Sequence, residues 1–543
     1  MTSQLFTAHP PLYEVKCFHP PHHIIKFLNT SHPSRPLLQP SVPLSLSLKD
    51  IHQTTTLPTK MAPSKPTTSG ITPRIIIHGG AGNISRANMP ADSYAGYRAS
   101  LRRILTLARA RLAAPDATAL DVAVHAVSLF EDDPLFNAGR GAVFTRAGTN
   151  ELEASVMVSS SSRGGGPYRK RGAGCMLLSH VKNPIKLAKE ILVRSGEGGE
   201  GGVGGGGGAG GAQGHVQLSG EYVEGLARGW GLEIVEPEYF FTQKRWDEHV
   251  KGLKREKRAA GKDGVEASDE DLGDGNDPSW DGKEYLPQGT VGAVVLDRFG
   301  TICAATSTGG LTNKLPGRIG DTPTFGAGYW AEEWIEEDVE ESSSTTTTPR
   351  MSYHPSVAAA AARSPIDRLS RGEITSLLSD CLPSLSSMSD VPSPTDEKPR
   401  PPRRLRHAVG MSGTGNGDSF LQVCAARTAA AIPRFSSSPS SKSLRDGLAW
   451  VAGPGGELQR SAGDRWGVTG EGQGGIIGIE LVVDDGPDGS LGEASEGGGE
   501  GRLVRSWVGY DLNCGGMFRA WVDGEGRERV AVFADEDGLK PGP

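Results

Sequence analysis

Residues Thr290–Leu296 (TVGAVVL), Asp297–Gly300 (DRFG) and Thr301–Thr306 (TICAAT) decide the fold class of this chain. Two apolar, β-branched runs flank a short turn that contains a glycine, and this pattern predicts a β-hairpin. Further runs predict strands at 74–78, 408–412, 475–482 and 503–508, and helices at 94–113 and from Thr118 onwards. Because strands and helices both occur and parallel strand–helix–strand units do not dominate, we expect a layered α+β sandwich.

Part of the chain has a composition that does not favour packing. The chain has 543 residues, of which 75 are Gly and 37 are Pro, and only 36% are hydrophobic. Glycine-rich, charge-rich and Pro/Ser/Thr-rich stretches bury too little apolar surface to offset their ordering entropy. We therefore predict a disordered N-terminal extension at 1–73, a Gly-rich insertion at 196–214, a flexible linker at 251–289 and a low-complexity insertion at 341–406.

Composition also bears on location and partners. No apolar stretch approaches the roughly 18 residues that a membrane helix needs, and a net charge of −7 gives no reason to expect nucleic acid. Six widely spaced cysteines and the lack of a secretory-type N-terminus favour a cytoplasmic protein with reduced thiols. Basic clusters such as Arg403, Arg404 and Arg406 resemble nuclear-import patches, but solvated charged linkers are more common.

The usual serine-, metal- and phosphate-binding motifs do not occur in this sequence, and an unusual density of threonine and glycine remains as the candidate for chemistry. Threonine and glycine gather at strand ends, as in Gly289-Thr290, Thr306–Gly310 and Gly413–Gly417. A Thr290 freed as a chain N-terminus would carry its own base, an α-amine with a pKa of about 7.7–8.0. On spacing alone, a Gln-Gly-Thr tripeptide is more often only a loop that enters a strand.

The same region resembles the centre of the plant-type asparaginase/isoaspartyl peptidase family, whose members are N-terminal nucleophile hydrolases. The resemblance rests on Thr290–Asp297 (TVGAVVLD) and Ala304–Asp321 (AATSTGGLTNKLPGRIGD). Further blocks fall in the expected order, namely Ile76–Gly82 (IIHGGAG), Pro134–Phe144 (PLFNAGRGAVF), Gly413–Asp418 (GTGNGD) and Leu512–Ala520 (LNCGGMFRA). Several ordered blocks are far more specific than one glycine cluster.

This resemblance implies the fold and the activity. The fold would be a four-layer αββα sandwich, and the chain would cut itself between Gly289 and Thr290. The products would be an α chain (74–289) and a β chain (290–543) that stay together in an (αβ)₂ dimer. The mature enzyme would hydrolyse L-asparagine and β-aspartyl dipeptides.

The resemblance also assigns roles to individual residues. Thr290 would be the nucleophile, with Thr308 hydrogen-bonded beside it, and Thr414 and Gly415 would form the oxyanion hole. Arg318 would bind the substrate α-carboxylate and Asp321 its α-ammonium group.

Other positions would support the site. Asn137 and the turn at Gly79-Gly80 would support the nucleophile and the self-cleavage, whereas His78 is not an obvious general base. A structural sodium ion, and no other cofactor, would bind backbone carbonyls in one loop, those of Phe130, Glu131, Asp133, Phe136, Ala138 and Arg140.

Three alternatives remain open. A glycosylasparaginase or a threonine-aspartase-type endopeptidase would share Thr290, but the first usually has Asn-Gly where this chain has Gly309-Gly310. The second typically lacks the acid that corresponds to Asp321. A catalytically inactive scaffold is the alternative from another class. Asn416, where many relatives carry Glu, and Cys514-Gly515, where many carry Thr-Glu, depart from the family pattern.

Overall fold

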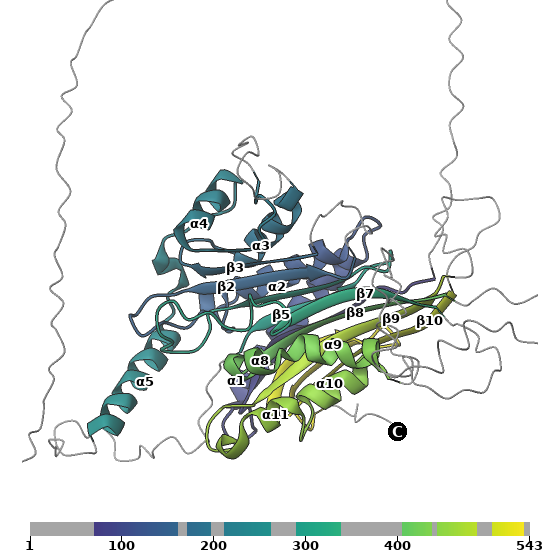
Figure 1. Cartoon of the computed structure of the whole chain (residues 1–543). Coiled ribbons are helices and arrows are strands. Elements are labelled where there is room, and N and C mark those ends of the chain that lie inside the picture. The colour runs from purple at the N-terminus through teal and green to yellow at the C-terminus, as the bar shows by residue number, and fades with distance from the viewer. Residues whose placement is uncertain are drawn as a thin grey trace, which may run out of the picture. The chain divides into compact units, whose positions relative to one another are not determined.

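A computed structural model describes residues 70–160, 171–196, 211–261, 289–337, 404–436, 442–485 and 502–536. All of them lie in one compact unit, Thr67–Pro543. Strands and helices are mixed in this unit (Figure 1), so the predicted α+β class is confirmed. No helix within the described ranges is both long and apolar enough to span a membrane.

The larger sheet has eight strands in the order β12-β11-β1-β5-β6-β2-β3-β4. Its neighbours are antiparallel except for the parallel pair β3–β4. The bounds are β1 Arg74–Gly82, β2 Leu152–Val158, β3 Gly172–Leu178, β4 Gln217–Ser219, β5 Val291–Leu296, β6 Ile302–Thr308, β11 Gly516–Val522 and β12 Glu528–Phe533. The predicted hairpin is confirmed, since β5 and β6 pair antiparallel around a turn at Gly300 with φ +85°.

The smaller sheet is an antiparallel sheet of four strands in the order β10-β9-β8-β7. The bounds are β7 Tyr329–Glu337, β8 Arg404–Gly415, β9 Gly474–Asp484 and β10 Arg502–Leu512. Three of these strands contain the predicted strands at 408–412, 475–482 and 503–508, which are therefore confirmed with longer bounds.

The described part of the chain contains nine α-helices. The bounds are α1 Ala91–Leu112, α2 Ala119–Glu131, α3 Pro184–Val193, α4 Gly220–Gly229, α5 Gln243–Gly261, α8 Gly417–Val423, α9 Ala425–Phe435, α10 Leu444–Ala452 and α11 Glu457–Ser461. Helices α1 to α3 contact the larger sheet, and α9 and α10 contact the smaller one. Thr118, where the sequence predicts this helix to start, caps α2 by accepting a hydrogen bond from the Asp121 amide.

Strand β5 shows how the sheets are packed. Val291, Ala293 and Val295 belong to the apolar cluster shared with α1 to α3. Val294 and Leu296 belong to a second cluster, shared with the smaller sheet. Side chains alternate between the two faces of a strand, so an apolar residue at every position indicates that both faces of β5 are covered.

The predicted linker at 251–289 is wrong for its first part. Helix α5 runs through Gly261, and Arg245 and His249, one turn apart on it, are buried. Lys, Glu and Arg are strong helix formers, so a charge-rich segment need not be a linker. Residues 262–288 of the predicted linker lie outside the described residues.

The predicted insertions also need correction at their edges. Residues 404–406 of the 341–406 segment begin β8, and Arg406 is buried in ion pairs with Glu333 and Asp485 rather than exposed in an import patch. Ala212, in the 196–214 segment, is buried in the core. Three parts of these predicted segments lie outside the described residues, namely 1–69, 197–210 and 341–403.

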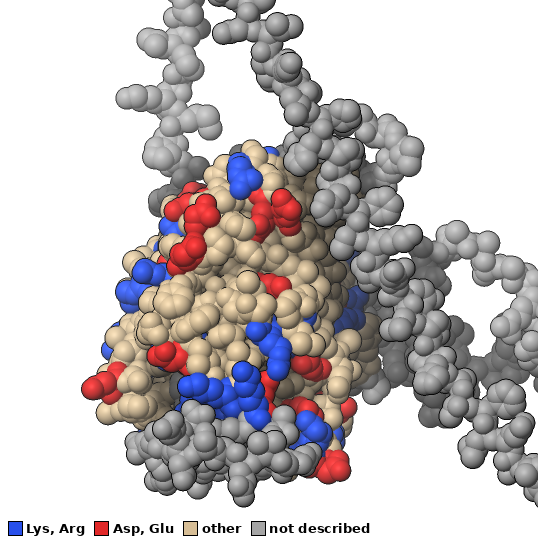
Figure 2. All heavy atoms as spheres, turned by 90° about the vertical axis from the view of Figure 1, so that its left-hand side faces the viewer, with Lys and Arg blue, Asp and Glu red and all other residues tan. Residues whose placement is uncertain are grey.

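Figure 2 shows one face of the molecule, on which basic and acidic side chains are both spread and neither sign covers the surface. This face offers no uniform field for a polyanion, and the expectation of no nucleic-acid partner stays a prediction.

Candidate active site

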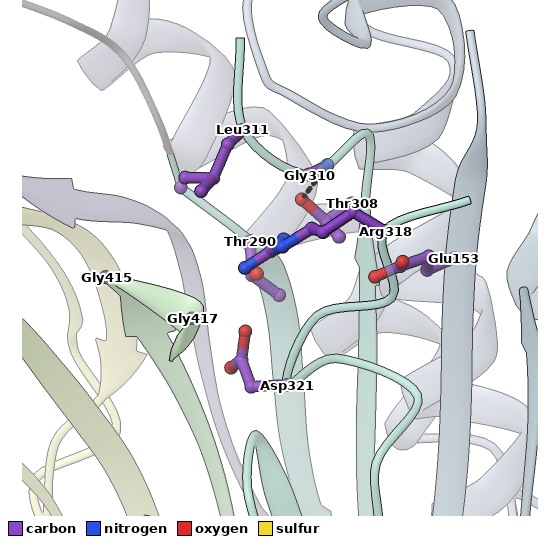
Figure 3. Close-up of a pocket in the computed structure, with 10 residues that line it drawn as sticks. Glu153, Thr290, Thr308, Gly310, Leu311, Arg318, Asp321, Gly415 and Gly417 are labelled. Atoms are coloured by element: carbon purple, nitrogen blue, oxygen red, sulfur yellow. Dashed lines mark hydrogen bonds between the residues drawn. The ribbon is translucent and has the colours of Figure 1, made fainter. Parts of the chain in front are cut away.

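A pocket lies at the start of β5, around Thr290 (Figure 3). Six of the predicted residues line it, namely Gly289, Thr290, Thr308, Arg318 and Asp321, and Gly415 from the other sheet. Thr290 is almost completely buried. The structure thus brings together predicted residues that are up to 126 positions apart in the sequence, from Gly289 to Gly415.

The hydroxyl group of Thr290 has a different partner from the predicted one. Thr290 Oγ1 and Thr322 Oγ1 are 2.9 Å apart. Thr308 Oγ1 instead accepts a hydrogen bond of 3.0 Å from the Gly310 amide, although it lines the same pocket. Thr322 was not among the predicted residues, and its only distinguishing feature in the sequence is its place directly after Asp321.

Gly79 and Gly80, predicted as a turn, lie inside β1, where a bulge contacts the residue before Thr290. Strand β1 shifts register against β11 between His78 and Ala81, and Gly80 has φ +124°. A Cβ atom at Gly289 would overlap the Cα of Gly80, so both glycines are required for this close approach. The Gly289–Thr290 peptide therefore lies against a backbone bulge.

Thr414 and Gly415 end β8 beside the pocket. Thr414 is fully buried, and its Oγ1 has no hydrogen-bond partner among the residues that the structure describes. A buried hydroxyl without a partner carries a free-energy penalty of about 1–3 kcal/mol, so it is poised to donate to a ligand. Gly415 has φ +147°, and a Cβ there would overlap the carbonyl oxygen of Gln473.

Arg318 and Asp321 approach Thr290 from two sides in Figure 3. Arg318 Nη2 forms an ion pair of 2.9 Å with Asp418. Asp321 is buried, and its Oδ2 has no partner within the described ranges. Burial raises the pKa of Asp321 to about 7, and the nearby Arg318 opposes this shift. The absent Cβ of Gly417 leaves room between the two side chains, since it would lie 2.5 Å from Asp321 Oδ1 and 3.0 Å from Arg318 Nη2.

Glu153 is a pocket residue that the sequence analysis missed. It lies opposite Thr308 in the β2–β6 pair, and its carboxylate accepts the Gly320 amide at 3.1 Å. The Lys314 ammonium group is 3.9 Å away, and burial raises the pKa of Glu153. This carboxylate holds the loop that carries Arg318. A glutamate inside an apolar strand was the signal that could have revealed it.

Asn137 holds the end of β6, as the resemblance implies for a supporting residue. Its Nδ2 donates to the Gly310 carbonyl at 2.8 Å, and its Oδ1 accepts the Val143 amide at 3.0 Å. Asn416, a departure from the family pattern, caps α8 by accepting the Ser419 amide at 3.0 Å.

The last residues of α2 and the loop that follows it contain the carbonyls assigned to a sodium ion. Three of them, those of Phe130, Asp133 and Ala138, accept backbone hydrogen bonds within the loop. A Cβ at Gly139 or at Gly141 would overlap the carbonyl oxygens of Glu131 and Phe136 respectively, so carbonyls crowd the interior of this loop. Neutral oxygens of this kind fit a hard monovalent cation. The described residues contain no group of three or more His, Cys, Asp or Glu side chains for another metal.

Comparisons with known proteins agree with this geometry. The sequence model of the asparaginase family matches residues 71–198 and 211–336. The chain is 40% identical over 257 residues to an isoaspartyl peptidase of Salmonella typhimurium, covering 47% of this chain and 69% of that protein. The isoaspartyl peptidase of Escherichia coli is also 40% identical over 257 residues, with 47% and 67% covered.

A third relative is a putative isoaspartyl peptidase/L-asparaginase of Dictyostelium discoideum, 36% identical over 274 residues, with 48% of this chain and 70% of that protein covered. The matched regions contain the β5–β6 hairpin and the loop with Arg318 and Asp321. The chain therefore belongs to the asparaginase family.

Proposed function

We propose that this chain is a self-cleaving amide hydrolase that acts on L-asparagine and β-aspartyl dipeptides, with Thr290 as nucleophile. One observation carries the proposal. A single pocket brings the Thr290 hydroxyl group next to a positively charged side chain, a buried carboxyl group and the end of β8, which would bind an oxyanion. Arg318 suits an α-carboxylate, Asp321 suits an α-ammonium group, and Thr414 suits an oxyanion.

Self-cleavage is the first reaction. Thr290 Oγ1 would attack the Gly289 carbonyl carbon, and the peptide nitrogen would leave as the new α-amine of Thr290. Water would then hydrolyse the resulting ester, which frees the Gly289 carboxylate and the Thr290 hydroxyl. The close Gly80–Gly289 contact supports this step, because it places the scissile peptide against rigid backbone.

Turnover would use the new amine. It would take the proton from Thr290 Oγ1 as the oxygen attacks the side-chain carbonyl of the substrate. Thr414 Oγ1 and the Gly415 amide would donate to the tetrahedral oxyanion. Ammonia or an amino acid would leave with the proton, and water would hydrolyse the β-aspartyl ester to release aspartate.

We also infer the four-layer αββα arrangement of N-terminal nucleophile hydrolases. Three separate apolar clusters support it, one between α1–α3 and the larger sheet, one between the sheets, and one between the smaller sheet and α9–α10. The division into an α chain (74–289) and a β chain (290–543), the (αβ)₂ dimer and the cytoplasmic location remain proposals.

The buried Asp321 favours this function over the endopeptidase activity that would use the same nucleophile. A threonine-aspartase-type endopeptidase must accept a continuous chain, and an unpaired buried carboxyl group would not serve a substrate without a free ammonium group. The glycosylasparaginase and the inactive scaffold are outcomes of the following test. Purified protein would be incubated with asparagine, a β-aspartyl dipeptide, an aspartylglucosamine and asparagine capped at its α-carboxylate.

We expect turnover of the first two substrates and little of the capped one. Arg318→Ala should raise KM for asparagine and lower kcat/KM. The loss of transition-state stabilisation should be about 2–4 kcal/mol, because a charged contact to the carboxylate is lost. Arg318→Lys is the control, since it keeps the charge but not the bidentate geometry. Equal turnover of capped and free asparagine would contradict this pocket assignment, and no turnover of any substrate would favour the scaffold.

The pKa of Asp321 predicts a pH dependence of substrate binding. The pKa of Asp321 is about 7, so this group is protonated in the free enzyme when the pH lies below that value. The neutral acid cannot form an ion pair with an α-ammonium group. KM for asparagine should therefore rise as the pH falls through about 7, and Asp321→Asn should bind weakly at every pH. Initial rates at several substrate concentrations from pH 5.5 to 8.5 would check this. A KM that stays constant over that range would contradict it.

A further inference from the structure

His78 and Ser412 form a buried hydrogen bond where the two sheets face each other. His78 lies on β1 of the larger sheet and Ser412 on β8 of the smaller one, and their Nε2 and Oγ atoms are 2.7 Å apart. Both side chains are fully buried, and the cluster between the sheets, which includes Ile76 and Ala408, is apolar. Losing one partner of a buried polar pair is costly, so this bond specifies how the sheets meet more strictly than an apolar contact does.

Gly292 leaves the room for this hydrogen bond. It lies directly opposite His78 in the β1–β5 pair. A Cβ atom at Gly292 would overlap both His78 Nε2 and Ser412 Oγ. Any other residue at this position of β5 would break the bond or push the two sheets apart.

The hydrogen bond lies beside both groups that the proposed reaction must bring together. Gly292 comes two residues after Thr290, and Ser412 comes two residues before Thr414 on β8. Residues two apart along a strand point to the same face. The bond therefore connects β1, the strand that pairs with β5, to β8, the strand that carries the oxyanion donor.

The ring of His78 suits a fixed contact rather than proton transfer. Burial lowers the pKa of His78 to about 3, and an interaction with the Thr290 backbone opposes this shift only in part. The ring is thus neutral at physiological pH, and Ser412 occupies its Nε2.

We propose that the His78–Ser412 hydrogen bond positions the Thr290 hydroxyl group against the Thr414 hydroxyl group, for self-cleavage and for turnover alike. Both are positioning residues, because they act through Thr290 and Thr414. The inference rests on the proposed function, which it deepens by adding a contact between the sheets to the machinery of the site.

The test compares three variants of the full chain. Ser412→Ala should slow self-cleavage and lower kcat for asparagine about ten-fold with KM little changed, as expected for the loss of one buried hydrogen bond. Ser412→Thr keeps the hydroxyl group and should restore kcat to within about three-fold. Ser159→Ala is the matched control. It removes another buried serine hydroxyl, which accepts the Ile302 amide at the far end of β6, and it should leave kcat unchanged.

Thermal melting of each variant would report folding, and a double-variant cycle adds a second readout. His78→Asn together with Ser412→Ala should lose no more activity than the worse single variant, because both remove the same bond. A folded, cleaved Ser412→Ala with kcat within two-fold of wild type would overturn the inference alone. Additive losses, or an equal fall in Ser159→Ala, would do the same. Wild-type protein that neither cleaves nor turns over asparagine would overturn the proposed function as well.

Discussion

Thr290→Ala should remain a single full-length chain and should hydrolyse asparagine at least about 10⁴-fold more slowly than wild type. The substitution removes the hydroxyl group that would attack both the Gly289 carbonyl and the substrate. It also leaves the amine locked in a peptide bond, so nucleophile and base are lost together. Mass spectrometry of wild type should find a fragment that begins at Thr290, and a denaturing gel should show no such split in the variant.

Thr290→Ser is the control for this experiment. It keeps a hydroxyl group and should still cleave, at a reduced rate. Wild-type cleavage at another peptide bond would remove the proposed mechanism, and so would cleavage that survives Thr290→Ala.

Thr414→Val should lower kcat for asparagine by about 10²–10³-fold while KM changes little, since an oxyanion donor acts mainly in the transition state. The variant should be at least as stable as wild type. Thr414 Oγ1 is buried without a partner in the described part of the chain, so an apolar group of the same shape removes an unsatisfied polar atom. Steady-state kinetics and thermal melting of the same samples would check both halves of this prediction.

Thr301→Val is the matched control for Thr414→Val. Thr301 is also buried, with an Oγ1 that has no partner within the described ranges, but it lies in the hairpin turn at the far end of β5 and β6. Its loss should leave kcat unchanged and should not lower the melting temperature. If both variants lose activity to the same extent, packing rather than oxyanion stabilisation explains the effect.

Local pattern predicted the elements on which the site is built. The β5–β6 hairpin follows from two β-branched runs around a glycine turn, and the cap of α2 follows from Thr118 and Asp121. The gathering of Arg318 and Asp321 around Thr290 was predicted only through the family motifs, because spacing alone does not distinguish substrate-binding residues from a surface ion pair.

Contacts between distant segments were not predictable in this way. The Thr290–Thr322 hydrogen bond depends on how a loop folds back onto β5. The spacing of apolar residues in the sequence does not predict where such a loop packs. The place of Arg406 was misjudged because a cluster of basic residues looks the same in a solvated linker and in a strand whose charges are paired. Composition reports average burial and does not identify a buried partner for one charge.

The order of strands in the larger sheet has a consequence for the lifetime of the cleaved protein. Strand β1 precedes the proposed cut, yet it lies between β11 and β5, which both follow it, and β6 in turn pairs with β2. Neither product of a cut at Gly289–Thr290 could therefore leave without breaking backbone ladders on both sides of a strand. Maturation would be a one-way event: the uncut chain folds as one molecule, whereas the mature pieces, once denatured, would have to find each other again. The durability of such an enzyme is set by how slowly it unfolds rather than by an equilibrium between folded and unfolded states.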